Sequence, residues 1–234
     1  MHDATKVLMG STQSSDKESS CYDSDPASFP AGRAVRVKSD GKLSLTLADG
    51  RLAGVSVGKS LSDTKKTAVV RAGNRVPIQL AKYLVKEDLS FVTKVNAAVA
   101  IEFLDTGTAG SEVVTVTGDD DAGYLISVSM EDAVSTATQM KAAIDGEAEA
   151  LALIETIISG TAGDAQAAFA EDDIDGMAQP VIGAAVRVSD VTGMAVPSAL
   201  GTATGAFYAS GALTGVQEDA TEIDVAVIDM AGGL

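Results

Sequence analysis

The sequence predicts a mainly β protein, with a β-barrel- or sandwich-like domain built from its N- and C-terminal segments and an α+β domain inserted between them. Three observations predict this fold. Similar segments recur near the two ends, apolar residues alternate with period two around them, and the segment between has helical spacing. The expected parts are an arm at 1–30, a β domain at 31–94 and 181–234, an insert at 95–165 and a linker at 166–180.

Three short segments recur in the same order near the two ends. Residues 34–37, 52–55 and 67–73 read A-V-R-V, L-A-G-V and T-A-V-V-R-A-G, and residues 185–188, 213–216 and 225–232 read A-V-R-V, L-T-G-V and V-A-V-I-D-M-A-G. Short matches also arise by chance in a chain rich in Val, Gly and Ala, but the shared order favours two related β units brought together in space. Such a duplication indicates a scaffold rather than a catalyst.

The first 30 residues are rich in Ser and Asp and have little apolar periodicity. Such a segment cannot bury enough apolar surface to order itself, so we expect an extended arm that becomes ordered when something binds it. Its apolar anchor is the run Val7, Leu8 and Met9. Arms of this kind run over neighbouring subunits, and a plain disordered terminus is the alternative.

From residue 33 apolar residues alternate with polar ones, as in strands with one buried face. The alternating positions are Val35 and Val37, Leu43, Leu45 and Leu47, Val55 and Val57, and Val76, Ile78 and Leu80. Turn residues separate them at 39–41, 49–50 and 72–74. We therefore expect a β meander whose polar face carries Arg33, Arg36, Lys38 and Lys42.

The insert is expected to have the order βββαβ. Its strands are predicted at 101–104, 113–116, 125–128 and 157–158. Thr136 and Gln139 have capping-box spacing, which predicts that a helix begins near Thr136. The apolar stripe of this helix comprises Met140, Ala143 and Ile144, is weakened at Gly146, and continues through Leu151 and Ile154. A short helix is expected at 165–170, and a closing strand of the β domain at 223–228.

Charge is distributed unevenly along the chain. The formal net charge is −16, yet residues 1–94 have 15 Lys and Arg against 10 Asp and Glu, whereas residues 95–234 have 2 against 23. A mildly basic part suits an acidic protein surface, and an acidic part keeps a crowded assembly soluble; the alternative is that the acidic part aids solubility alone. Nucleic-acid binding is not expected, because the basic residues are scattered and few aromatic residues accompany them.

The sequence also indicates in which cellular compartment the chain is made. The lone Cys21 cannot form an intramolecular disulfide, and no stretch is apolar enough to span a membrane. The N-terminus lacks the apolar core of a signal peptide. We therefore expect a chain that is made in the cytoplasm and has no membrane partner.

The sequence contains partial matches to a phosphate-binding loop and to a calcium-binding loop, and in each case a structural explanation is favoured. Residues 53–60, A-G-V-S-V-G-K-S, fit a relaxed phosphate loop, but their valines alternate as in a strand, so nucleotide binding is not expected. Residues 171–176 place oxygen donors as the first half of a calcium loop does, yet Ile182 stands where a Glu is required. Solvated acidic turns are favoured there and at 119–121, with an adventitious divalent site as the alternative.

Residue types needed for common enzyme chemistry are scarce. The single histidine is His2, in the expected arm, so no Ser-His-Asp or Cys-His arrangement is expected in the core. Zinc sites need clusters of Cys and His, and the chain has one of each. No enzymatic activity, catalytic residue, cofactor or metal is predicted.

Two sets of segments carry a family resemblance. The first comprises residues 31–45 (A-G-R-A-V-R-V-K-S-D-G-K-L-S-L), 54–60 (G-V-S-V-G-K-S) and 69–78 (V-V-R-A-G-N-R-V-P-I). It resembles the head decoration (cement) proteins of tailed bacteriophages. The second comprises residues 101–118 (I-E-F-L-D-T-G-T-A-G-S-E-V-V-T-V-T-G) and 135–144 (S-T-A-T-Q-M-K-A-A-I), and it resembles a module that recurs in phage structural proteins. The large insert departs from the smallest decoration proteins.

The resemblance implies a structural virion protein that decorates and stabilises a capsid. Such proteins bind the outer capsid surface across major capsid protein subunits, commonly as a homotrimer, after synthesis in the host cytoplasm. With the charge and the arm, this makes the expected capsid contacts Val7, Leu8, Met9, Lys17, Arg33, Arg36, Lys38 and Lys42. The alternatives are a tail tube or head–tail joining protein, and a module that binds a host-surface glycan or protein through the insert.

Overall fold

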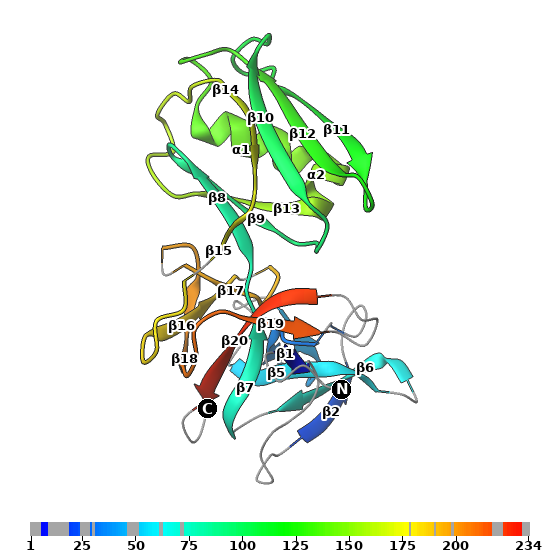
Figure 1. Cartoon of the computed structure of the whole chain (residues 1–234). Coiled ribbons are helices and arrows are strands. Elements are labelled where there is room, and N and C mark those ends of the chain that lie inside the picture. The colour runs from blue at the N-terminus through cyan, green and yellow to red at the C-terminus, as the bar shows by residue number, and fades with distance from the viewer. Residues whose placement is uncertain are drawn as a thin grey trace. The chain divides into compact units, whose positions relative to one another are not determined.

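The computed structural model describes residues 6–8, 19–23, 29, 31–45, 52–60, 63–70, 73–177, 179–189, 191–197, 199–216 and 222–230. The chain is mainly β, as the sequence predicts, and it divides into two compact units (Figure 1). Unit 1 comprises Met1–Ala81 and Ala178–Leu234, and unit 2 comprises Lys82–Met177.

Unit 1 has two sheets in its described residues. The first has the strand order β2-β6-β5-β3-β4, and its members are β2 (Ser19–Asp23), β3 (Ala34–Val37), β4 (Leu43–Ser44), β5 (Leu52–Ser60) and β6 (Asp63–Val70). The second has the order β1-β19-β20-β18-β16-β17, with β7 also paired to β20, and its members are β1 (Lys6–Leu8), β7 (Gly73–Gln79), β16 (Ala185–Val188), β17 (Ala195–Val196), β18 (Thr202–Tyr208), β19 (Leu213–Val216) and β20 (Glu222–Met230). Because β7 precedes unit 2 in the chain and β20 follows it, their pairing joins the two parts of unit 1.

Two segments of the expected N-terminal arm are strands of unit 1. β1 pairs in parallel with β19, and β2 pairs antiparallel with β6. The expectation of an arm that is ordered only by another partner is therefore wrong for these segments. Strand pairing uses main-chain N–H and C=O groups, which nearly every residue carries, so S-S-C-Y-D forms a strand without an apolar periodicity to reveal it.

The A-V-R-V match near the two ends is a structural repeat. We define repeat 1 as β3, β4, β5 and β6, and repeat 2 as β16, β17, β18 and β20. In repeat 1, β3 pairs with β4 and β5, and β5 pairs with β6. In repeat 2, β16 pairs with β17 and β18, and β18 pairs with β20. The first and third sequence matches therefore fall on equivalent strands.

The main chain in front of the two A-V-R-V strands has the same geometry. Gly32 and Gly183 have φ of 81° and 84°, a region that favours glycine. Gly32 N donates to Ser56 O at 2.7 Å. Gly183 N donates to Tyr208 O at 2.8 Å. Each acceptor residue returns an amide hydrogen bond to the residue after the glycine, at 2.8 Å in repeat 1 and 2.9 Å in repeat 2.

The second sequence match does not fall on equivalent strands. Gly54 of β5 lies opposite Val35 of β3, and β18 takes the place of β5 in repeat 2. Gly54 and Gly205, a residue of β18, both have a positive φ. The L-T-G-V segment forms β19, which pairs with β1 and β20 instead. Matching L-A-G-V with L-T-G-V is therefore wrong, because such short strings recur without sharing a place in the sheet.

Unit 2 has two four-stranded sheets and two helices. Its sheets have the orders β11-β12-β10-β14 and β13-β9-β8-β15. The members are β8 (Lys82–Lys86), β9 (Leu89–Thr93), β10 (Val99–Asp105), β11 (Val113–Asp119), β12 (Gly123–Met130), α1 (Ala137–Gly146), α2 (Ala148–Leu153), β13 (Ile154–Ile158), β14 (Phe169–Asp173) and β15 (Gly176–Met177). The strands predicted at 101–104, 113–116 and 125–128 are confirmed within β10, β11 and β12, and the one at 157–158 within β13.

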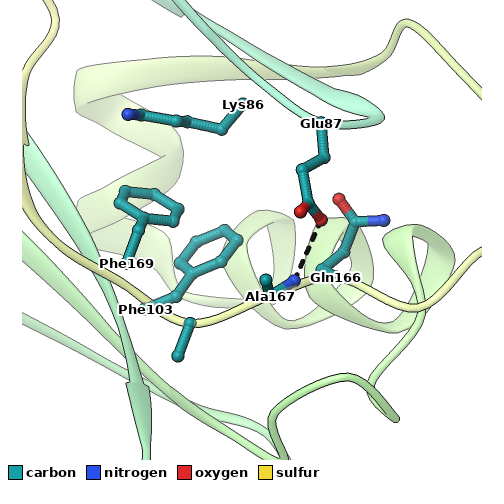
Figure 2. Close-up of a pocket in the computed structure, with 7 residues that line it drawn as sticks. Lys86, Glu87, Phe103, Gln166, Ala167 and Phe169 are labelled. Atoms are coloured by element: carbon teal, nitrogen blue, oxygen red, sulfur yellow. Dashed lines mark hydrogen bonds between the residues drawn. The ribbon is translucent and has the colours of Figure 1, made fainter.

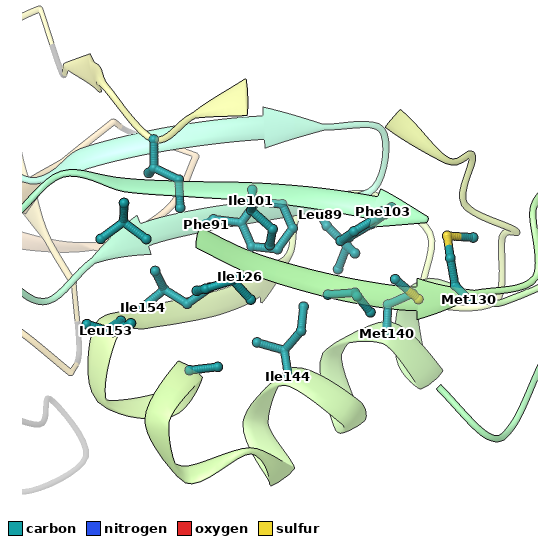
Figure 3. Packing of buried hydrophobic residues seen from close by; sticks show 14 of the residues in the cluster. Leu89, Phe91, Ile101, Phe103, Ile126, Met130, Met140, Ile144, Leu153 and Ile154 are labelled. Atoms are coloured by element: carbon teal, nitrogen blue, oxygen red, sulfur yellow. The ribbon is translucent and has the colours of Figure 1, made fainter. Parts of the chain in front are cut away.

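The core of unit 2 gathers between its strands and helices (Figure 3). Side chains from both sheets and from α1 are fully buried in it, among them Leu89, Phe91, Ile101, Ile126, Met140 and Ile144. The predicted capping box is confirmed at the start of α1, where Thr136 N donates to Gln139 Oε1 at 2.8 Å and Gln139 N donates to Thr136 Oγ1 at 3.4 Å.

Unit 2 is larger than the insert expected at 95–165. β8 and β9 precede that range and pair with β15 and β13. β14 and β15 lie in the expected linker at 166–180, and β14 pairs with β10. The helix expected at 165–170 is wrong, because Phe169 begins β14. A short Ala-rich segment is marginal as a helix, and its main chain instead hydrogen-bonds to the turns and strands around it.

The apolar stripe of the helix does not continue beyond α1. The main chain at Glu147, which follows α1, is extended, with φ −89° and ψ 114°, so α2 begins a new helix axis. Apolar residues spaced for one continuous helix therefore no longer lie on the same face after this break. Leu151 is consequently 43% exposed, and Ile154 begins β13 rather than extending the helix.

Candidate functional site

Four of the expected capsid contacts come from the N-terminal segment. The structure describes little of them. Val7 and Leu8 lie in β1, where the main chain is described and the side chains are not. Met9 and Lys17 lie outside the described residues.

The four basic residues expected on one polar face do not share a surface. Arg33 and Arg36 are buried, 7% and 1% exposed, whereas Lys38 is half-buried and Lys42 is exposed. The prediction that all four lie on the polar face, opposite the buried face of the sheet, is therefore wrong for the two arginines, which are buried. The arginines belong to the interior of unit 1, and only the lysines remain at its surface.

A turn of repeat 2, described at Ser189 and at 191–194, lies against the start of β3. Arg33 Nη1 donates to Thr192 O at 3.1 Å, and Ala34 N donates to Gly193 O at 2.8 Å. Desolvation by burial lowers the pKa of Arg33 to about 10, because it disfavours the charged form. Alternation within one strand cannot reveal a turn that lies 159 residues away along the chain.

The exposed part of this region is the turn at 38–42, between β3 and β4. Residues 39–42 are exposed, and Asp40 Oδ1 accepts a hydrogen bond from Lys42 N at 3.0 Å. Gly41 has a φ of 81°, and no described atom lies within 4 Å of the place where a Cβ would stand. Residues 39–42 of this turn therefore lie at the surface of unit 1.

A pocket of about 120 Å³ lies in unit 2, where the turn between β8 and β9 meets the start of β14 (Figure 2). Its lining residues are Lys86, Glu87, Phe103, Gln166, Ala167, Ala168 and Phe169. The rings of Phe103 and Phe169 lie 4.5 Å apart between centroids at a 45° tilt. Lys86 Nζ lies 5.1 Å from the Phe169 ring centroid and 2.6 Å from Asp172 Oδ2, with which it forms an ion pair.

The polar groups of the pocket are bonded within the chain. Glu87 has a φ of 48°, unusual for a residue other than glycine, and its Oε2 accepts from Ala167 N at 2.9 Å. The buried Gln166 donates from Nε2 to Asp88 Oδ2 at 3.1 Å and to Asp164 O at 3.0 Å. These bonds tie the β8–β9 turn to the segment before β14.

The pocket fits a structural role. Small-molecule sites commonly enclose about 300 Å³ or more, so this volume suits a few waters or one small side chain. The ammonium of Lys86 is engaged by Asp172, and the carboxylate of Glu87 by the main chain. Sequence reasoning missed this pocket because its lining comes from three separate segments, and two scattered phenylalanines were the only signal.

The weaker sequence motifs also have structural explanations. Residues 53–60 belong to β5, which confirms the strand interpretation over a phosphate loop. In the acidic turn after β11, Asp119 Oδ1 accepts from Asp121 N at 3.0 Å and from Ala122 N at 2.8 Å. Glu171–Asp173 of the calcium-like motif lie in β14 rather than in a loop. Among the described residues, no group of three or more His, Cys, Asp and Glu could hold a metal ion.

The acidic charge belongs to unit 2. Unit 2 has 4 Lys and 19 Asp or Glu, a net charge of −15, whereas unit 1 has 13 Lys or Arg and 14 Asp or Glu, a net charge of −1. The positive balance of residues 1–94 does not correspond to a compact unit, because residues 178–234 complete unit 1 and add mostly acids. Unit 1 is thus nearly neutral rather than basic.

In the part of the chain that the structure describes, no helix has both the length and the apolar character needed to cross a membrane. Comparisons with protein-family models, with characterised proteins and with solved structures found no match to this chain.

Proposed function

We propose that the protein is a structural virion protein that decorates and stabilises a bacteriophage capsid, with unit 1 bound across subunits of the major capsid protein. The segments that resemble decoration proteins, at 31–45, 54–60 and 69–78, all belong to unit 1. The segments that resemble a module of phage structural proteins, at 101–118 and 135–144, belong to unit 2. The two resemblances therefore separate along the same boundary as the two compact units.

The observation that carries the proposal is the division of charge between the units. A nearly neutral β unit can dock on a protein shell without a large electrostatic penalty. A unit with a net charge of −15 remains in solvent and repels its neighbours on a crowded surface. In this proposal unit 1 supplies the contacts and unit 2 keeps the decorated particle soluble.

Capsid stabilisation would then be mechanical. Each copy bridges adjacent subunits through many modest contacts, and several copies joined in one oligomer bind far more tightly than one copy alone. Since β1 and β2 are strands of unit 1, deleting residues 1–30 would damage the unit itself and cannot serve as a clean test.

The test is co-sedimentation of the full-length protein with heads of its phage prepared without it. We expect saturable pelleting at a ratio set by the number of capsomers. Absence of pelleting, with assembly of the pure protein into rings or tubes, would overturn the proposal in favour of a tail component.

Lysine acetylation of free and head-bound protein locates the docking unit. Unit 1 has seven lysines and unit 2 has four, among them Lys86 and Lys141, whose side chains are 32% and 35% exposed. We expect the additional protection on heads to fall on lysines of unit 1. Protection confined to the four lysines of unit 2 would contradict the assignment of the docking unit.

A further inference from the structure

The two turns that follow the A-V-R-V strands are closed by the same pair of main-chain hydrogen bonds, although the second turn is one residue longer than the first. Turn 1, at 38–42, joins β3 to β4, and turn 2, described at Ser189 and at 191–194, joins β16 to β17. In each, the amide of the first residue donates to the carbonyl of the last, at 2.8 Å in turn 1 and 2.9 Å in turn 2. The amide of a glycine, Gly41 or Gly193, donates to the carbonyl of the first residue at 3.0 Å in both. The turns are therefore equivalent parts of the structural repeat.

Turn 2 is docked within the chain. Its Gly193 O accepts from Ala34 N at 2.8 Å, and its Thr192 O accepts from Arg33 Nη1 at 3.1 Å. A Cβ at Gly193 would lie 2.5 Å from Ala34 O, so the two main chains are in close contact. The docking buries the receiving residues, which are 7% exposed at Arg33 and 2% at Ala34.

Within the chain, turn 2 docks on repeat 1, but among the described residues the equivalent docking of turn 1 on repeat 2 is not made: both of the surfaces it would use are exposed. Turn 1 corresponds to turn 2. Ala184 and Ala185 correspond to Arg33 and Ala34, which receive turn 2, because each pair directly follows a glycine with positive φ. Residues 39–42 of turn 1 are exposed, and so are residues 181–185. The latter segment carries Val181 and Ile182, which are 65% and 71% exposed.

We propose that a second copy of this chain closes the open contact, with turn 1 of one copy docked on residues 181–185 of the next. In this contact Ala185 N donates to Gly41 O, as Ala34 N donates to Gly193 O within the chain. The docking covers the apolar side chains of Val181 and Ile182, which favours association.

Because turn 1 and residues 181–185 are different surfaces, the contact is heterologous, and copies join head to tail into a ring or an open chain. The structural repeat and the exposure of residues 39–42 and 181–185 support this contact, which goes beyond the proposed function because it names the surfaces through which copies meet. It does not require that the protein bind a capsid.

Sedimentation equilibrium of the full-length protein tests the contact. We expect a mass above the 23.6 kDa of one chain, and Val181→Asp to weaken association about tenfold or more, because an aspartate is costly to bury. Val113→Asp is the matched control, since Val113 on β11 of unit 2 is 57% exposed, and it should leave the mass unchanged. Circular dichroism of each variant confirms that it folds.

Disulfide trapping identifies the surfaces directly. In a Cys21→Ser background, Asp40→Cys is mixed with Ala184→Cys under an added oxidant, because this pair corresponds to Thr192 and Arg33. We expect a covalent dimer from this mixture and none when Val113→Cys replaces Ala184→Cys.

A protein that stays monomeric at all concentrations would overturn the inference, and so would an oligomer that neither responds to Val181→Asp nor gives the mixed disulfide. A monomer that still pellets with heads would overturn this contact alone and leave the proposed function standing.

Discussion

Gly41 and Gly193 occupy equivalent places in the two turns, yet their surroundings differ. Both have a positive φ, 81° and 66°, where a residue with a Cβ costs about 1–2 kcal/mol. At Gly41 a Cβ would meet no described atom within 4 Å. At Gly193 it would lie 2.5 Å from Ala34 O and 2.9 Å from Leu45 Cδ2. One glycine is therefore needed for its main-chain conformation, and the other for close approach as well.

We expect Gly193→Ala to destabilise unit 1 more than Gly41→Ala does. Gly41→Ala should lower the free energy of unfolding by about 1–2 kcal/mol, the cost of the left-handed main chain. Gly193→Ala adds a clash with main-chain atoms, which displaces turn 2 from β3 and reduces the stability further. Differential scanning calorimetry of both variants measures the difference, and equal losses would contradict the docking of turn 2.

Glu112 links two loops of unit 2 through its carboxylate. Its Oε1 accepts from Gly110 N and from Ser135 Oγ, both at 2.8 Å. Desolvation raises the pKa of Glu112, but these hydrogen bonds outweigh it and hold the pKa below its usual value of 4.5. A lowered carboxyl pKa stabilises the folded state above the unfolded pKa, and this stabilisation is lost as the pH falls through the folded pKa.

Glu112→Gln should therefore lower the Tm of unit 2 at pH 7 by a small amount, and the gap between the two proteins should close in acid. The amide keeps an acceptor oxygen but no charge, so its hydrogen bonds are weaker at neutral pH. Thermal melts of both proteins across pH 3–7 provide the comparison. A gap that stays constant or widens toward pH 3 would show that the charge of Glu112 is not the cause.

Helices α1 and α2 face the core of unit 2 differently, because the extended main chain at Glu147 separates their axes. Ile144 of α1 is fully buried among residues of both sheets, whereas Leu151 of α2 is 43% exposed. Their apolar character is similar, so burial alone separates their contributions.

We expect Ile144→Ala to lower the free energy of unfolding of unit 2 by about 2–5 kcal/mol, the usual cost of a cavity in a packed core. Leu151→Ala should change it by no more than about 0.5 kcal/mol, as at most exposed positions. Denaturant titration followed by circular dichroism measures both. A loss at Leu151 comparable with that at Ile144 would mean that α2 packs by the predicted stripe after all.

Elements specified by local chemistry were predictable, and those specified by pairing over long distances were not. The capping box at Thr136 and the strand at 125–128 depend on neighbouring residues, and both are confirmed. β2 and β14 depend on main-chain pairing with strands far away, and their polar sequences have no periodicity to signal it. The burial of Arg33 likewise depends on a turn supplied by the distant repeat.

At the scale of the whole molecule, a duplication and a division of charge organise the chain. The A-V-R-V match predicted the structural repeat, because both copies share the same arrangement of glycine and main-chain hydrogen bonds. The charge asymmetry was visible in the sequence, but its boundary was not, since unit 1 closes through β7 and β20 from opposite parts of the chain. The nearly neutral unit 1 and the acidic unit 2 are the basis of the proposed decoration of a capsid.

Electron cryomicroscopy of phage heads assembled with and without the protein tests this proposal most directly. We predict added density on the outer surface at junctions between capsid subunits, with unit 1 against the shell and unit 2 in solvent. Heads that are identical in the two preparations, with the protein found in the tail or absent from the particle, would contradict the account.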